Sequence, residues 1–246
     1  MQQRTQAAVA VSAAVVVFAV AGYVIAHRDP VEHAGQTPGY VLTTAGSAPT
    51  AAASTAPVSH TPVIAFVGDD YTSGKGASAK SKRFSSLVAD DLNASETNIG
   101  HDGAGYAKKG PDGKSYADLI AAVVDARPDV VVVTGGRNDV LEEVDQDTLS
   151  AAVAKLFTTL HEKLPQAHLI AVRPFWGDSD PPRQLTALAQ MVKTAVTKAG
   201  GTYIGLADPL HGHSDYMADD ADPNTAGHRA IARALEPRLR PLVTES

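Results

Sequence analysis

From residue 63 onward, short apolar runs alternate with longer amphipathic segments. The apolar runs have the length and β-branched content of strands, and they predict five of them, at residues 63–67, 96–99, 129–134, 168–172 and 202–206. The segments between them have helical periodicity and predict helices near residues 83–92, 116–126, 147–163, 184–199 and 225–239. This alternation predicts an α/β fold, a three-layer sandwich with a central parallel sheet of about five strands.

The carboxyl ends of the predicted strands are where a ligand site is expected. The run VVVV at 130–133 is continuous and β-branched, as in a strand that is covered on both faces. In sheets of this kind, ligands bind beyond the carboxyl ends of the strands. The stretch VGDDYTSG at 67–74 completes the first predicted strand and opens the loop after it, so its polar side chains should lie at that edge.

The pattern before residue 62 is different. Residues 7–26 (AAVAVSAAVVVFAVAGYVIA) carry no charge and are long enough to span a bilayer as a helix. We interpret residues 1–28 as an N-terminal transmembrane anchor, or as a signal segment if the chain is cleaved after Ala26. Residues 29–61 are rich in Ala, Thr, Ser and Pro and predict a disordered linker. We therefore expect a single-pass protein of the cell membrane, with the folded domain at 62–246 extracytoplasmic, or secreted after cleavage.

Composition excludes several classes of protein. The 246 residues, 44% of them hydrophobic, suffice for one well-buried domain and a tail. The chain has no cysteine, which excludes disulfides, thiolate metal sites and a cysteine nucleophile. Its net charge is -6, and the short Lys-rich run at 75–83 is interpreted as a solvated loop, so we expect no nucleic-acid partner.

Four motifs, in the order of the chain, resemble the signature blocks of the SGNH, or GDSL, hydrolase family. They are GDDYTSG at 68–74, NIGHDGAGY at 98–106, GGRND at 135–139 and DDADPNTAGH at 219–228. The resemblance implies the SGNH hydrolase fold, which is flavodoxin-like. It also implies ester hydrolysis by a serine, a histidine and an aspartate, with backbone and amide N–H groups forming an oxyanion hole.

The resemblance assigns roles to individual residues, with two departures. Gly103 and Asn138 stand at oxyanion-hole donors, and Asp219 stands at the acid of the triad. The serine position, however, holds Asp70, and the histidine position holds Asp222. Losing the nucleophile or base of such a triad costs on the order of a millionfold in turnover. The pattern therefore predicts a pseudoenzyme, a hydrolase scaffold that binds rather than hydrolyses.

The substituted aspartates allow several roles. Asp70 could accept hydrogen bonds from the oxyanion donors, and Asp222, followed by Pro223, has the pattern of a helix N-cap. The family fold implies that Asp70, Asp219 and Asp222 converge, which would require a shared proton or a bound cation, for which Ca²⁺ or Mg²⁺ is suited. No other cofactor is expected. Two carboxylates could also cleave a glycosidic bond, or Asp70 could be an ester-forming nucleophile.

Other residues at the predicted site have two readings each. Arg137 could meet an anionic group of a ligand or pair with an aspartate. Trp176, the only tryptophan, could stack on a sugar, line an acyl groove or plug the end of the core. His211 and His213 would need a third ligand to hold a metal, and none is evident. For His228 we favour packing at the start of the last helix.

Three functions remain open from the sequence. The first, which we favour, is a membrane-anchored binding or accessory protein whose partner is a cell-envelope glycan, a lipid, an acyl ester or an envelope protein. The second is a hydrolase or transferase that uses Asp70 and Asp222 in a different mechanism. The third is a structural envelope protein.

Overall fold

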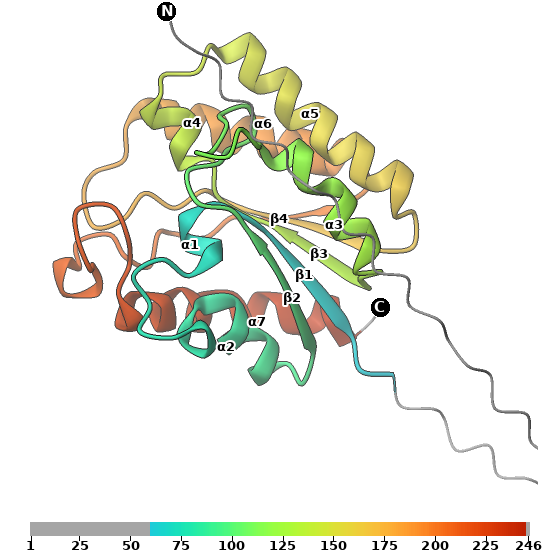
Figure 1. The fold of residues 1–246 in the computed structure, drawn as a ribbon, viewed down its shortest axis with the longest axis horizontal. Coiled ribbons are helices and arrows are strands. Elements are labelled where there is room, and N and C mark those ends of the chain that lie inside the picture. The colour runs from blue at the N-terminus through green and yellow to red at the C-terminus, as the bar shows by residue number, and fades with distance from the viewer. Residues whose placement is uncertain (1–59, 245–246) are drawn as a thin grey trace, which may run out of the picture. The chain divides into compact units, whose positions relative to one another are not determined.

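A computed structural model of the chain describes residues 60–244, and within them five parallel strands form one sheet in the order β2-β1-β3-β4-β5. The strands are β1 (Val63–Gly68), β2 (Ser95–Gly100), β3 (Val130–Val133), β4 (His168–Val172) and β5 (Thr202–Ile204). Figure 1 shows the sheet between two layers of helices. The predicted three-layer α/β fold with a five-stranded parallel sheet is confirmed.

Helices α3, α5 and α6 cover one face of the sheet, and α2 and α7 cover the other. The longer helices are α2 (Phe84–Asp91), α3 (Ile120–Asp125), α5 (Gln146–Lys163), α6 (Arg183–Lys198) and α7 (Thr225–Thr244). The short ones are α1 (Asp70–Ser73), α4 (Arg137–Leu141) and the 3-10 turns η1 (Lys80–Lys82), η2 (Tyr116–Leu119) and η3 (Ser214–Tyr216). The two shortest α-helices, α1 and α4, each begin at the carboxyl edge of the sheet, where the site lies.

The strand β3 shows why the core has two halves. Val131 and Val133 pack in one cluster with helix residues such as Phe157, whereas Val130 and Val132 pack in the other with residues of α2 and α7. All four valines are fully buried. Because successive side chains of a strand point to opposite faces, a run of four β-branched residues fills both layers at once.

The predicted and observed elements differ mainly at their ends. The fifth strand stops at Ile204 rather than at residue 206, and the last helix continues to Thr244 although Pro237 and Pro241 lie inside it. A proline removes one helical hydrogen bond, but the buried side chains of Leu239 and Val243 hold this part of α7 against the core.

The predicted anchor at 1–28 and nearly all of the predicted linker at 29–61 lie outside the described residues. Among residues 60–244, none of the helices has both the length and the apolar character that crossing a bilayer requires.

Gly100, the last residue of β2, sets how closely α1 can approach the sheet. A Cβ atom at this position would lie 2.1 Å from the backbone nitrogen of Ser73. We expect Gly100→Ala to lower the free energy of unfolding by about 2 to 4 kcal/mol, because the backbone of α1 would have to move. Urea denaturation measures this. The control is Gly205→Ala, an exposed position whose nearest contact would be a tyrosine ring atom at 3.2 Å. Equal effects of the two substitutions would contradict the prediction.

Candidate functional site

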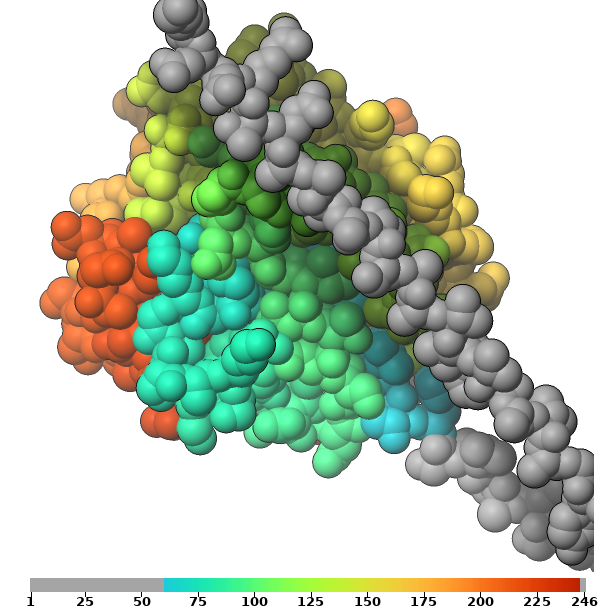
Figure 2. All heavy atoms as spheres, viewed as in Figure 1, coloured from blue at the N-terminus to red at the C-terminus, as the bar shows by residue number. Residues whose placement is uncertain are grey.

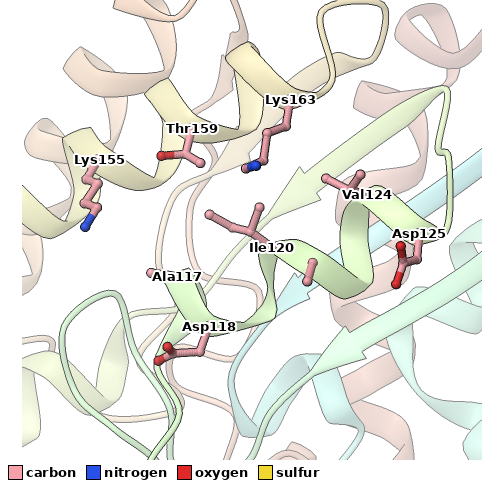
Figure 3. Close-up of a pocket in the computed structure, with 9 residues that line it drawn as sticks. Ala117, Asp118, Ile120, Val124, Asp125, Lys155, Thr159 and Lys163 are labelled. Atoms are coloured by element: carbon pink, nitrogen blue, oxygen red, sulfur yellow. The ribbon is translucent and has the colours of Figure 1, made fainter.

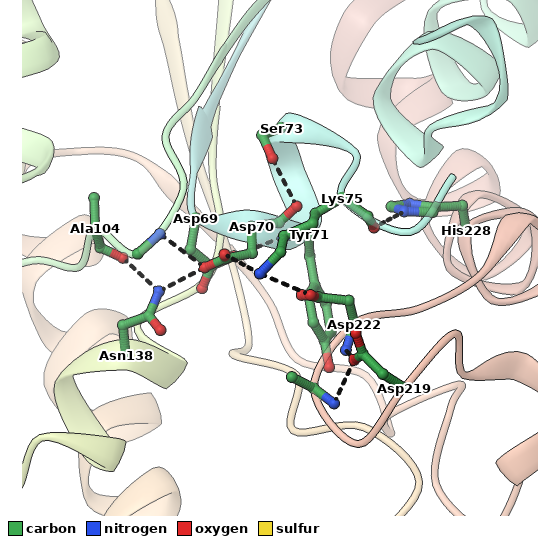
Figure 4. A network of polar contacts seen from close by, with 12 residues as sticks. Asp69, Asp70, Tyr71, Ser73, Lys75, Ala104, Asn138, Asp219, Asp222 and His228 are labelled. Carbon is green, nitrogen blue, oxygen red and sulfur yellow. Dashed lines mark hydrogen bonds and ion pairs between the residues drawn. The ribbon is translucent and has the colours of Figure 1, made fainter. Parts of the chain in front are cut away.

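The loop after β1 is built to present one side chain. Asp69 caps the single turn of α1 by accepting a hydrogen bond from the backbone N–H of Tyr71 at 3.2 Å, and Gly74 ends the turn in the left-handed conformation. Asp70 is the first residue of this turn. With Asp69 pointing inward as the cap, Asp70 faces the loops that follow β2 and β3 (Figure 4).

The carboxylate of Asp70 is held by the two groups that the resemblance assigns to an oxyanion hole. Its Oδ2 accepts hydrogen bonds from the Gly103 backbone N–H at 3.0 Å and from the Asn138 side-chain amide at 2.9 Å. Asn138 also donates to the Ala104 carbonyl at 2.9 Å, which fixes the orientation of its amide. Burial disfavours the charged form of Asp70, but these bonds and the nearby Lys75 outweigh it and hold the pKa of the carboxyl below its ordinary value.

Lys75 joins the two substituted aspartates. Its Nζ lies 3.3 Å from Asp70 Oδ1 and 2.9 Å from Asp222 Oδ2. A lysine thus places a positive charge between the two carboxylates, a group that the sequence reasoning about a shared proton or a bound cation did not consider. Burial raises the pKa of Asp222, and repulsion from Asp70 adds to this, although Lys75 opposes both.

Sequence reasoning missed Lys75 because a short Lys-rich run has the pattern of a solvated loop. Two contacts hold this loop, one against the first turn of α7 and one against the segment before it. The His228 ring binds the backbone carbonyl of Lys75, and Gly76 lies so close to Pro223 that no Cβ would fit between them. In Figure 2 the cyan segment after β1 and the orange-red segment before α7 lie side by side on the surface. The sequence feature that could have identified Lys75 is its position five residues after Asp70, a carboxylate for which the motif supplies no cation.

His228 packs at the start of α7, as the sequence suggested. Its Nδ1 accepts a hydrogen bond from the Phe84 backbone N–H at 3.3 Å, and its Nε2 lies 3.0 Å from the Lys75 carbonyl, to which it donates. This partner set assigns the neutral tautomer with the proton on Nε2. Burial lowers the pKa of the imidazole, which agrees with a neutral ring. Both ring nitrogens are engaged with the backbone, so His228 serves no proton transfer at Asp70.

Asp219 lies near enough to the other two aspartates for its charge to help raise the pKa of Asp222, but among residues 60–244 it forms no ion pair with Lys75. Its exposed carboxylate accepts hydrogen bonds from the backbone N–H groups of Ala221 and Asp222, both at 2.8 Å. The structure thus brings Asp70 and Asp222 together through Lys75 and turns Asp219 toward its own loop. Within the described residues, no group of three or more His, Cys, Asp or Glu side chains is placed to hold a metal ion.

The suggested N-cap role of Asp222 is wrong. Helix α7 begins at Thr225, and the capping side chain is Asn224, whose Oδ1 accepts from the N–H groups of Ala226 at 2.8 Å and Gly227 at 3.1 Å. The residue after Asp222 is Pro223, which has no N–H and precedes the helix. Asp222 is therefore free to face Lys75.

Arg137 and Trp176 contact each other at the edge of the site. Arg137 Nε donates to the Trp176 carbonyl at 3.1 Å, and its guanidinium carbon lies 4.9 Å from the centroid of the indole ring. Within residues 60–244, Arg137 forms no ion pair with an aspartate. The guanidinium covers part of one indole face, and Trp176 also packs against the core.

A cavity of about 180 Å³ lies at this site. The residues that line it are Asp69, Asp70, Tyr71, Lys75, Arg137, Asn138, Leu141, Ala221 and Asp222. A larger cavity of about 530 Å³ lies between α5 and the segment formed by η2 and α3, with Lys155, Thr159 and Lys163 on one side and Ile120 and Val124 on the other (Figure 3). It shares no lining residue with the first and contains none of the motif residues.

Comparison with known proteins agrees with the motifs. The model of the GDSL-like lipase/acylhydrolase family matches residues 66–230. A GDSL lipase of Mycobacterium tuberculosis is 27% identical over 189 residues, which cover 72% of this chain and 80% of that protein.

Solved structures share the fold at low sequence identity. A G-D-S-L family protein from Desulfitobacterium hafniense has a TM-score of 0.58 at 12% identity, over 72% of this chain and 98% of that one. A family two carbohydrate esterase from Clostridium thermocellum, in complex with cellohexaose, has a TM-score of 0.61 at 20% identity, over 74% of this chain and 65% of that one.

Asp69 should make stability depend on pH. It is buried and accepts from the Gly136 N–H at 3.2 Å; burial, with repulsion from Asp70, raises its pKa to about 7 from an ordinary 3.8. The folded state thus holds this proton more tightly, and the stability that Asp69 contributes is present below pH 3.8 and lost as the pH rises through 7.

The variant Asp69→Asn removes this dependence. Between pH 4 and pH 8, the free energy of unfolding of the variant, relative to the natural chain, should rise by at most about 4 kcal/mol. Urea denaturation at several pH values measures the difference. A difference that stays constant over this range would contradict the raised pKa.

Proposed function

Because the chain belongs to the GDSL-like lipase/acylhydrolase family, we propose that it is a degenerate member that binds a ligand at the cell envelope and lacks serine-histidine ester hydrolysis. One observation carries the proposal: the Asp70 carboxylate accepts the hydrogen bonds of Gly103 and Asn138. Catalysis of acyl transfer requires such donors to be aimed at the oxyanion of the transition state. While Asp70 holds them, they are not available to a substrate carbonyl.

Among residues 60–244, none of the groups near Asp70 is placed to replace the missing serine and histidine. Ser73 is turned away, since its hydroxyl donates to the Asp70 backbone carbonyl at 2.9 Å. His228 is engaged at both ring nitrogens. Asp222 is paired with Lys75 at 2.9 Å, and that lysine is positively charged and so cannot act as a base. These contacts support the absence of a proton acceptor for the family's reaction among the described residues.

The location and the ligand class belong to the same proposal. The uncharged segment at 7–26 supports a membrane anchor that leaves the folded domain extracytoplasmic. The carbohydrate esterase from Clostridium thermocellum, which shares the fold, was solved in complex with cellohexaose. That likeness, together with the family's lipases, supports a glycan, a lipid or an acyl ester as the ligand here, with an envelope protein as the other partner class.

A second candidate function is hydrolysis or group transfer through the aspartates themselves. It is favoured by Asp222, which is buried with a raised pKa and could therefore hold a proton for a leaving group. It is disfavoured by Asp70, whose carboxylate is held by two hydrogen bonds and Lys75 and is a weakened nucleophile for that reason. A purely structural envelope protein with a vestigial pocket is the third candidate.

Short-chain ester hydrolysis by the full chain tests the proposal. We expect the natural protein to hydrolyse p-nitrophenyl acetate at the background rate. Asp70→Ser with Asp222→His should raise the rate by at least about tenfold, because the first empties the hole and supplies a nucleophile while the second supplies a base. Asp70→Ser alone is the matched control and should gain less. A robust rate in the natural chain that Asp70→Ala abolishes would overturn the proposal and favour the second candidate.

A further inference from the structure

Arg137 presents a guanidinium to the cavity beside Asp70 with most of its hydrogen-bonding capacity unused. The Nε atom is committed to the Trp176 carbonyl at 3.1 Å, and the group is held 4.9 Å from the indole centroid. Within residues 60–244, neither terminal nitrogen donates a hydrogen bond to the protein, and no carboxylate forms an ion pair with the group. Arg137 is thus fixed in place while its outer edge remains available.

Lys75, the other cation that lines the cavity, is already paired with carboxylates. Lys75 shares its charge between Asp70 and Asp222, at 3.3 Å and 2.9 Å. Lys75 therefore balances charges that belong to the protein, whereas the outer edge of Arg137 has no such partner in the part of the chain that the structure describes. A guanidinium whose orientation is already fixed loses little conformational freedom when it binds, and its planar fork matches a carboxylate or a phosphate.

Leu141 adds an apolar contact to the same cavity. It lies four residues after Arg137, at the end of α4, so the two side chains lie on the same face of the helix. Leu141 lines the cavity and is 51% exposed, and it is the one exposed large hydrophobic side chain among the described residues. A ligand that carried an apolar group next to its charge would cover this side chain.

We propose that this cavity binds an oxyanion, a carboxylate or a phosphate, carried on an apolar group, with Arg137 holding the oxyanion and Leu141 contacting the apolar group. The inference rests on the proposed function, since it names the ligand class of the same site. The cavity of about 180 Å³ accommodates a head group and a few carbon atoms rather than a whole lipid or oligosaccharide. The rest of such a ligand would extend over the surface.

The charges that surround Arg137 limit the affinity of the site. Asp69 and Asp219 lie near enough for the charge of Arg137 to favour their ionised forms, although burial still raises the pKa of Asp69 overall. Asp70 and Asp222 line the same cavity. This negative field opposes a bound anion, and Lys75 offsets part of it. For a ligand of about six heavy atoms we therefore expect a Kd on the order of 1 mM.

Four matched probes test the chemistry: butyrate, butyl phosphate, butanol and butylamine, each titrated calorimetrically into the full chain. At least one anion should bind with a Kd on the order of 1 mM, and butanol should bind at least about tenfold more weakly. Preference for butyrate assigns the site to free carboxylic acids, and preference for butyl phosphate assigns it to phosphate head groups. Failure of both anions to bind at about 50 mM, or binding of butylamine or butanol as tightly as the anions, would overturn the proposal.

Variants assign the binding to the two residues. Arg137→Gln should weaken binding of the preferred anion by about tenfold, and Arg137→Lys should weaken it less, because the charge remains while the fork is lost. The matched control is Arg173→Gln, another half-buried arginine, which lines different cavities and should leave the Kd unchanged. Unchanged binding in folded Arg137→Gln, or a loss confined to Arg173→Gln, would overturn the proposal.

Leu141→Ser keeps the proposal testable if the arginine variants fail to fold. It should weaken binding of butyrate about threefold and leave acetate unchanged, because only the longer probe reaches Leu141. Equal effects on the two carboxylates would contradict the assigned apolar contact. Titration and ester hydrolysis are separate measurements, so an active natural enzyme would overturn the proposed function without deciding whether Arg137 binds the anion.

Discussion

The carboxylate of Asp70 holds together segments that lie far apart in the sequence. One oxygen accepts hydrogen bonds from the loop after β2 and from α4, at Gly103 and Asn138. The other reaches Lys75, which in turn binds Asp222 in the loop before α7. Each of these segments follows a strand or precedes a helix at the carboxyl edge of the sheet. The parallel arrangement of the strands alone therefore places them close together. The geometry of the cavity depends on this one group remaining ionised.

Asp69 and Asp70 are adjacent in sequence, yet their environments move their pKa values in opposite directions. Asp69 is fully buried and receives two backbone N–H bonds, which do not compensate for the loss of hydration, so its pKa rises to about 7. Asp70 is less buried and receives two hydrogen bonds and a lysine, so its pKa falls. Repulsion between the two adds to the separation, since ionising one makes ionising the other harder. A proton on Asp69 therefore helps to keep the charge on Asp70.

The sequence predicted the sheet mainly because β-branched runs such as 130–133 fill both layers of the core, although β2 (Ser95–Gly100) has no such run. The resemblance of the motifs to the family implied that Gly103 and Asn138 would face position 70, and both donate to Asp70. The sequence did not predict the position of Lys75. That position depends on its loop contacting His228 in the first turn of α7 and Pro223 just before the helix. Helix caps also depend on local geometry, which is why Asn224 and not Asp222 caps α7.

Asp70 and Asp222, which the resemblance places at the family's proton-transfer positions, are physically coupled through Lys75. Without a cation, Asp222 would place a second ionised carboxylate beside Asp70 in a partly dehydrated cavity. The repulsion between them would either raise the pKa of one carboxyl or move the loop. With Lys75 between them, both stay in place, and the effects of changing one should depend on the other. A hole filled by the protein's own charge also differs from an empty one, because its donors are satisfied and no longer attract a ligand oxygen. A ligand of the proposed kind would use groups that the network leaves unpaired, and within the described cavity the outer edge of Arg137 is such a group.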